Sequence, residues 1–114
     1  ERGIRPYSIS TDIYRTNIHG PVYSLLTTLS KFLALGFGLT EVIASVTERP
    51  AAALGLEDSL GSLAAGRTAD ISILRLVEGP VTLTDSEGQS LNGAQMLQPV
   101  YTIRAGKVFT HADP

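Results

Sequence analysis

The sequence contains no cysteine, and this absence removes several classes of site. Disulfide bonds and thiolate metal centres are excluded because both need cysteine sulfur. A thiol nucleophile is excluded for the same reason. The composition is compatible with a reducing compartment, and we expect a cytoplasmic protein.

A long hydrophobic run is missing as well. The longest uncharged apolar run is FLALGFGL (32–39), well short of the roughly 18 residues that a membrane span requires. No signal peptide or membrane span is therefore predicted. The formal net charge is -2, whereas proteins that bind nucleic acid or an anionic membrane usually have an excess of basic residues. We expect neither as a partner.

Histidine is scarce. The chain holds only His19 and His111, and no His-x-His motif. A catalytic zinc needs about three protein ligands, so the sequence predicts no complete metal centre within this chain. We expect His19 to be a polar loop residue and His111 to be exposed in the tail. A phosphate loop and a Ser/His/Asp set are also missing.

What is present is typical of a folded domain. The 114 residues are 43% hydrophobic and 18% charged, which argues against disorder, and they suffice for one domain. Helical patterns fill the chain to about residue 56, and strand and turn patterns follow. The first residue is Glu1 rather than Met, so we expect a piece of a longer protein.

The first half predicts a strand, a loop and a helix. Residues 7–11 (YSIST) alternate in the manner of a short strand. A loop through Asn17 follows. Pro21 suits the first position of an amphipathic helix over about 22–35. Gly36 is the predicted end of that helix.

Two shorter helices are predicted next. Thr40 is the expected cap of the first, with Glu41 near its positive end. Proline disfavours helical geometry at the preceding Arg49, so the second is expected to begin at Pro50.

The second half predicts four or five short strands. A strand over 71–77 is expected to break at Gly79-Pro80 and to continue over 81–84. A hairpin is expected around residues 105–106, between strands at 100–104 and 107–110. The strands indicate part of a sheet or sandwich, and a self-contained α+β domain is the alternative.

Several segments then resemble the metal-dependent amidohydrolase superfamily, in its dihydroorotase-like, adenine-deaminase-like and deacetylase members. The resemblance covers almost the whole chain in order, and the run T-x-x-P-A-x-x-L-G-L followed by G-S-L-x-x-G-x-x-A-D is its most specific part. Arg49 departs from it, because many relatives carry Asn before the proline. The matching segments are ISTDIYRTN (9–17), GPVYSLLTTLSKFLALG (20–36), EVIASVTERPAAALGL (41–56), GSLAAGRTADISIL (61–74) and PVYTIRAGKVF (99–109).

The resemblance implies an α/β fragment of a two-part enzyme. Residues 1–56 would be the end of a (β/α)8 TIM barrel, with 8–12 as barrel strand 8, followed by helices. Residues 57–114 would be the C-terminal share of a small β-sandwich. Active sites of such barrels lie at the C-terminal ends of the strands, which is the position of Asp12.

The resemblance also implies a chemistry. Metal-activated hydroxide, with zinc or another divalent metal, would hydrolyse a C–N bond of a small-molecule amide or cyclic amide. Asp12 would be the catalytic carboxylate and would also touch the metal. The family's remaining ligands, His residues and often a carboxylated Lys, are not in this chain, so we expect the isolated fragment to be inactive and to hold no metal. From pattern alone, an Asp that follows Ser-Thr at a strand end is usually a turn or cap residue.

Other candidates are weaker. Asn17, Gly20 and Pro21 follow the predicted strand and could border the substrate, or could simply form a helix-start turn. Asp70 is expected to cap or orient a strand. The expected partner is the missing N-terminal part of the same enzyme, or a second copy of the chain. The competing hypothesis is a freestanding, non-catalytic α+β interaction module.

Overall fold

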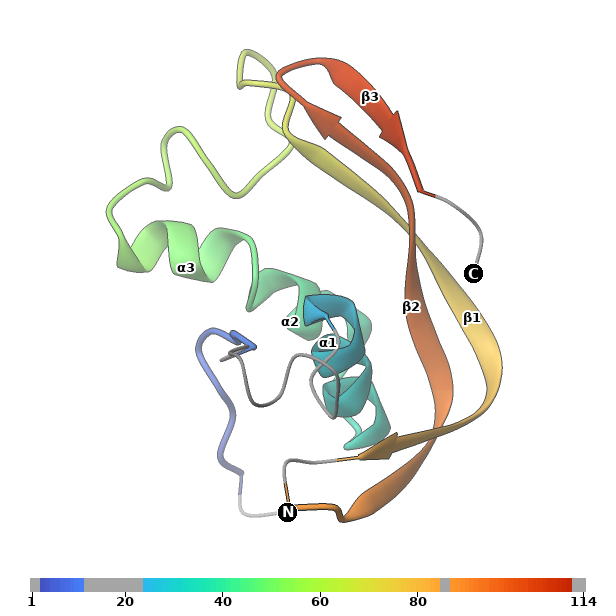
Figure 1. Ribbon diagram of the computed structural model, residues 1–114. Helices are drawn as coiled ribbons and strands as arrows, with labels where there is room; N and C mark the ends of the chain where they lie inside the picture. The colour runs from blue at the N-terminus through green and yellow to red at the C-terminus, as the bar shows by residue number, and fades with distance from the viewer. Residues whose placement is uncertain (1–2, 12–23, 85–86, 112–114) are drawn as a thin grey trace.

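The computed structural model describes residues 3–11, 24–84 and 87–111 of the chain. Within these ranges, three short helices precede three antiparallel strands (Figure 1). α1 and α2 lie beside the half of the sheet where β2 begins, and β3 pairs with the far end of β2 (Figure 1). In chain order, the elements are α1 (Leu25–Ala34), α2 (Leu39–Ala44), α3 (Glu48–Ala53), β1 (Ile71–Thr84), β2 (Ser90–Arg104) and β3 (Lys107–Thr110).

The first helix begins at Leu25 rather than at Pro21 because Ser24 caps it. Ser24 has extended backbone, and its hydroxyl accepts a hydrogen bond from the Thr27 N–H at 3.1 Å. Such a cap contributes about 1 kcal/mol to helix stability. The predicted end of the helix is confirmed, since Gly36 has a φ of +97°, a left-handed geometry that glycine adopts at little cost.

The starts of the next two helices differ from the prediction. Thr40 lies inside α2, and the cap position belongs to Gly38, which makes no side-chain cap bond. Glu41 does lie in the first turn, where the helix dipole favours a carboxylate. α3 begins at Glu48, before Pro50. Proline is tolerated there because N–H groups of the first helical turn have no partner within the helix.

β1 continues through Gly79-Pro80, where a break was predicted. The pairing register shifts at this point: Glu78 pairs with Gln95, whereas Val81 pairs with Gly93. Two residues of β1 therefore oppose one residue of β2, which is a β-bulge. Bulges are among the few places where a sheet accepts proline.

β2 begins at Ser90, about ten residues earlier than predicted. In the described ranges the sheet therefore has two long strands and one short one, rather than four or five short strands. Asn92-Gly93 and Pro99 look like turn residues in the sequence. In the fold, Gly93 lets β2 approach α1, because a Cβ there would lie 3.1 Å from the Ala34 Cβ. Pro99 lies beside a second register shift.

The predicted hairpin at residues 105–106 is confirmed. Ala105 and Gly106 both have positive φ, 48° and 84°, as a two-residue type I′ turn requires. The Asp70 carboxylate accepts a hydrogen bond from the Ala105 N–H at 2.8 Å. Asp70 thus orients the end of the sheet, as expected from its place before β1.

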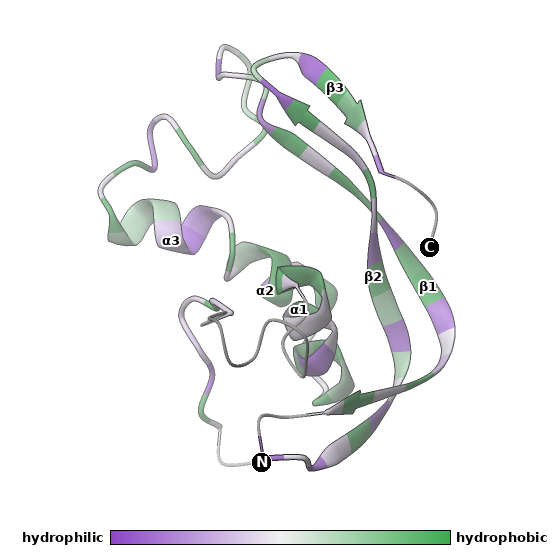
Figure 2. Cartoon of the chain, viewed as in Figure 1, coloured by the Kyte–Doolittle hydropathy of each residue, from purple (hydrophilic) through white to green (hydrophobic). Residues whose placement is uncertain are grey.

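The core lies where α1 and α2 meet β2, and Figure 2 shows hydrophobic residues on all three elements there. Leu29, Val42 and Leu97 form its centre and are 1%, 1% and 5% exposed. Around them pack partly buried apolar side chains, namely Ile9, Leu26, Phe32, Leu33, Phe37 and Val46.

A buried hydroxyl joins the helix to the sheet. The Ser30 hydroxyl donates to the Leu26 carbonyl at 2.8 Å and accepts from the Leu97 N–H at 3.0 Å. Ser30 is fully buried. Its hydroxyl therefore satisfies a β2 backbone donor that burial would otherwise leave without a partner, a loss of about 1–3 kcal/mol.

Residues 7–11, predicted as a strand, show no strand pairing. The Ile9 N–H donates to the carbonyl of Ser45, at the end of α2, at 3.0 Å. A β-strand is defined by a hydrogen-bonded neighbouring strand, and the described ranges provide none for this segment. The prediction of a paired strand is therefore not met by residues 7–11.

The chain is thus a small α/β piece with an antiparallel sheet, as the coarse fold prediction had it. Among the described residues, no helix has the length and apolar character needed to cross a membrane.

Candidate functional site

The predicted site residues fall on a part of the chain that the structure does not describe. Asp12, the catalytic candidate, and Asn17, Gly20 and Pro21, the substrate-binding candidates, all lie between 12 and 23, as does His19. The structure describes the approach to Asp12 as far as Thr11 and continues from Ser24. The structure therefore shows the residues on either side of the predicted site and not the predicted site residues themselves.

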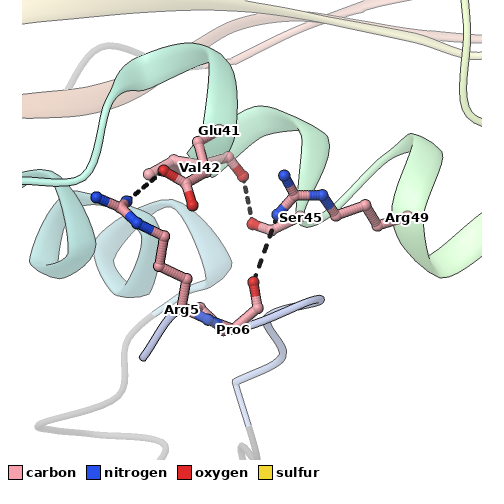
Figure 3. Close-up of polar contacts among 6 residues, drawn as sticks. All are labelled: Arg5, Pro6, Glu41, Val42, Ser45 and Arg49. Atoms are coloured by element: carbon pink, nitrogen blue, oxygen red, sulfur yellow. Dashed lines mark hydrogen bonds and ion pairs between the residues drawn. The ribbon is translucent and has the colours of Figure 1, made fainter. Parts of the chain in front are cut away.

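The approach segment is tied to the start of α2 through Arg5. The Arg5 guanidinium forms an ion pair with the Glu41 carboxylate at 2.6 Å (Figure 3). The same guanidinium lies over the Phe37 ring, 5.0 Å from its centroid. A planar guanidinium suits both contacts, since it can stack on a ring while it donates in its plane.

Two further contacts tie the segment to the end of α2 and to α3. The Arg49 side chain reaches back from α3 and donates to the Pro6 carbonyl at 3.4 Å (Figure 3). The Ile9 N–H donates to the Ser45 carbonyl at 3.0 Å. Ser45 is itself buried, and its hydroxyl donates to the Val42 carbonyl at 2.5 Å. Residues 5–9 are therefore held at three points by α2 and α3.

These contacts were not predicted from the sequence. Arg5 and Glu41 are 36 positions apart, and Arg49 and Pro6 are 43 apart. Periodicity and spacing report only on neighbours within one element, so they carry no signal for pairs at this separation. The one available hint was the presence of Arg49 where the resemblance favours Asn.

A metal centre is not found among the described residues. No group of three His, Cys, Asp or Glu side chains in the described ranges is placed to hold a metal ion. His111 is exposed, and its Nε2 lies 2.7 Å from the Thr102 hydroxyl oxygen. The Asp70 carboxylate is engaged with the hairpin turn. The described residues therefore do not fit a metal by themselves.

One hollow of about 350 Å³ lies between the end of α1 and β2. Among the described residues, its lining has two amide side chains and no titratable group, so these residues offer no acid, base or nucleophile. The lining residues are Leu33, Ala34, Asn92, Gly93, Ala94 and Gln95.

Comparison with known proteins identifies the family. The sequence model of the amidohydrolase family matches residues 14–110. A deacetylase of Enterococcus faecalis is 38% identical over 108 residues, which are 94% of this chain and 29% of that protein.

Two crystal structures agree with this result. The crystal structure of an adenine deaminase superposes with a TM-score of 0.89 at 37% sequence identity. The match covers 96% of this chain and 30% of the adenine deaminase chain. The crystal structure of a dihydroorotase gives a TM-score of 0.86 at 32% sequence identity. The match covers 96% of this chain and 29% of the dihydroorotase chain.

The chain spans less than a third of the length of each of these three proteins. The family model, however, covers most of the chain. The arrangement of short helices before an antiparallel sheet is shared with both crystal structures at high TM-score. The chain belongs to the amidohydrolase family.

Proposed function

We propose that this chain is the C-terminal part of an enzyme that hydrolyses a C–N bond in a small-molecule amide or cyclic amide. The observation that carries the proposal is the match of the family model over residues 14–110. The adenine deaminase and dihydroorotase similarities support the same bond type, since both names denote cleavage of a C–N bond, and the removal of an acetyl group from nitrogen by a deacetylase would cleave one too.

The proposed architecture has two parts. Residues 1–56 would complete a (β/α)8 barrel, with 8–12 as its last strand, and residues 57–114 would contribute to a β-sandwich. The lack of strand pairing at residues 7–11 is compatible with this arrangement, because a barrel strand pairs with neighbouring barrel strands and the described ranges provide none. The rest of the enzyme would then be the first partner of this chain.

Asp12 is the proposed catalytic residue. An ionised carboxylate is a pure hydrogen-bond acceptor, so it can take a proton from an attacking water and pass it to the departing nitrogen. Asn17, Gly20 and Pro21 are proposed to border the substrate, because they follow Asp12 closely in the sequence. A cytoplasmic location stays a prediction from the composition.

Dependence on zinc or another divalent metal is part of the proposal and rests on the family alone. When bound, such a metal supplies activated water near neutral pH. Its ligands, Asp12 aside, would have to come from parts of the enzyme outside this chain, because the described residues provide no set of them.

A second candidate, a non-catalytic interaction module, draws on one observation. Large apolar side chains with more than half of their surface exposed include Ile4, Tyr7, Leu35, Leu54, Leu63 and Val108. Exposed apolar side chains can serve as contacts for a partner where they lie together on one surface. The enzyme proposal accounts for the same surface through the remainder of the barrel and sandwich.

The deciding experiment compares the complete reading frame with the 114-residue chain. Both would be assayed for acetate release from N-acetylated amino acids, ammonia release from adenine, and hydrolysis of dihydroorotate. Metal content would be measured on the same samples. We expect turnover and bound metal in the complete protein and neither in the short chain.

Asp12→Asn in the complete protein is the direct test of the catalytic assignment. We expect kcat to fall by about 10²–10⁴-fold, the usual cost of losing a general acid–base group. Asp58→Asn, at an exposed position, is the matched control and should keep wild-type activity. An Asp12→Asn enzyme with full activity would overturn the assignment, and a complete protein inactive on the whole panel would favour the interaction module.

A further inference from the structure

One edge of β2 has no neighbouring strand over most of its length. The other edge pairs with β1 from Ser90 to Ile103, whereas β3 pairs with this one only from Tyr101 to Arg104. Within the described ranges, no further strand lies along residues 90–100 of β2. α1 lies beside this stretch, and β3 lies at the far end of the strand (Figure 1). The outward backbone groups of the stretch therefore need water or another segment as their partner.

The Leu97 N–H identifies the residues that point to this open edge. It donates to the Ser30 hydroxyl of α1, so it points away from β1. In an antiparallel strand, the N–H and C=O groups of alternate residues point to opposite edges. The extra residue of the bulge near Pro80 belongs to β1, so the alternation along β2 is not interrupted there. The backbone groups of Gln95 and Gly93 therefore point to the open edge as well.

The hollow of about 350 Å³ lies along this open edge. Its lining contains four consecutive residues of β2, Asn92 to Gln95, together with Leu33 and Ala34 at the end of α1. Consecutive side chains of a strand point to opposite faces of the sheet. A hollow lined by four consecutive residues therefore follows the edge of the strand rather than one face. An exposed strand edge is where an extended segment can add to a sheet through main-chain hydrogen bonds.

The outer edge of β1 and the open edge of β2 differ in the features that discourage pairing. Proteins protect a strand edge that faces water with charged side chains, proline or bulges. β1 has all three near its middle, in Arg75, Glu78 and the bulge at Pro80. The stretch of β2 from Leu91 to Leu97 has no charged residue, no proline and no extra residue. An edge without such protection is typical of one that a further segment covers.

We propose that an extended, uncharged segment from the rest of the enzyme lies in this hollow and adds to β2 as a strand. It would bond to the backbone of Gly93 and Gln95 and would lie about 4.8 Å from β2. The inference rests on the proposed function, because it takes the chain to be part of a longer enzyme. In each of the three relatives, more than two thirds of the length lies outside the match, so such a segment is available. An uncharged segment suits the described lining, which has two amides and no charged side chain.

Hydrogen exchange in the complete enzyme tests whether the open edge is covered. Met96 and Gln98 point to β1, so their amides report the exchange rate of paired groups in the same strand. Mass spectrometry with single-residue resolution gives the rates, corrected for the intrinsic rate of each amide. The Gly93 and Gln95 amides should exchange within about 10-fold of the Met96 and Gln98 rates. A larger excess would show an edge open to water and overturn the inference.

Photo-cross-linking identifies the occupant. With p-benzoylphenylalanine in place of Asn92, the complete enzyme should cross-link within one molecule, to residues that precede Glu1 in its sequence. The matched control carries the same group in place of Glu57, an exposed residue outside the hollow. A cross-link from position 92 to residues 1–114 or to a second copy would overturn the inference. So would a yield no higher than that of the control.

A proline variant tests the backbone contact itself. Gln95→Pro removes the N–H that points to the open edge and keeps the pairing with β1, which does not use that N–H. It should raise the Gly93 exchange rate by about 10-fold relative to Met96, the effect of one lost hydrogen bond. Gln95→Ala keeps the N–H and should raise that rate by less than about twofold. Equal rates in the two variants would overturn the inference.

These readouts are independent of turnover, so the two proposals can fail separately. A complete enzyme that is active on the substrate panel but exchanges Gly93 and Gln95 rapidly would overturn the strand addition alone. A complete protein that is inactive on the whole panel, but shows slow exchange and the expected cross-link, would overturn the proposed C–N hydrolysis and support the strand addition.

Discussion

The two halves of the β1–β2 sheet are built from the same strands but are covered very differently. In the half beside α1, Leu83 and Leu97 are 4% and 5% exposed. In the half that carries the hairpin, Ile73, Tyr101 and Val108 are 42%, 41% and 57% exposed. All four residues of β3 are exposed. A residue of this sheet is thus buried where it packs against α1, whichever strand it belongs to.

The difference shows what holds each half. The covered half combines a hydrophobic core with the Ser30 bond to the β2 backbone. The hairpin half depends on the backbone hydrogen bonds between its strands, on its tight turn, and on the hydrogen bond that Asp70 makes to that turn. The register places the apolar side chains of the hairpin half on one face, since Ile73 pairs with Tyr101, and Ile103 with both Ile71 and Val108. That face is the one we expect a second sheet to cover in the proposed sandwich.

The largest effect is expected for one of two leucines that are paired on the neighbouring strands β1 and β2. Leu97 and Leu76 are cross-strand partners, yet Leu97 is 5% exposed and Leu76 is 36% exposed. Leu97→Ala should lower the free energy of unfolding by about 3 kcal/mol, because it leaves a cavity among Leu29 and Val42. Leu76→Ala should cost only about 1 kcal/mol. Urea unfolding measures both, and equal losses would contradict the conclusion that packing against α1, rather than position along the strands, decides how much a leucine of this sheet contributes.

A smaller effect is expected in the segment that connects the helices to the sheet. Gly61 and Gly66 both have positive φ, +89° and +90°. A Cβ at Gly61 would lie 2.8 Å from the Thr47 carbonyl oxygen and 2.9 Å from the Ala51 Cβ, whereas one at Gly66 would meet no atom within 4 Å. Gly66→Ala should therefore cost only the backbone term, about 1 kcal/mol, and Gly61→Ala about 2–3 kcal/mol in total.

Thermal or urea unfolding of the two alanine variants supplies the comparison. Gly61 is the first residue of the G-S-L segment in the family-like motif, and it packs where α3 begins. Similar losses at the two positions would show that only the backbone conformation matters there. A larger loss at Gly61 would show that the close approach to α3 fixes how the helical half joins the sheet.

Local sequence signals predicted local structure well. The amphipathic pattern of α1, the end at Gly36 and the turn at Ala105-Gly106 were all found, because each depends on residues a few positions apart. The strand at 90–99 was missed and β1 was cut at Gly79-Pro80. In both cases a tertiary contact or a bulge accommodates residues that favour turns in isolation.

The candidate site was only partly predictable. Asp12 was singled out by a family resemblance and not by its surroundings, and it lies outside the described residues. The contacts of Arg5 with Glu41 and of Arg49 with Pro6 could not be predicted, because they join positions 36 and 43 apart. They form only when α2 and α3 fold against residues 5–9.

The smallest effect concerns the hairpin half alone and has the opposite sign. Ala105 has a φ of 48° and is the one non-glycine residue with positive φ in the described ranges. A Cβ is strained in that conformation by about 1–2 kcal/mol, while glycine adds about 0.5–1 kcal/mol of backbone entropy to the unfolded chain. Ala105→Gly should therefore stabilise the protein by about 0.5 kcal/mol.

Ala52→Gly, at an exposed position in α3, is the control, and there the same replacement should destabilise by about 1 kcal/mol. Both variants are compared by their urea midpoints. If Ala105→Gly also destabilises, the free energy of strain at the turn is smaller than the stabilisation that alanine provides by lowering the entropy of the unfolded chain. The hairpin half would then owe its stability to the ladder and the Asp70 bond rather than to its turn.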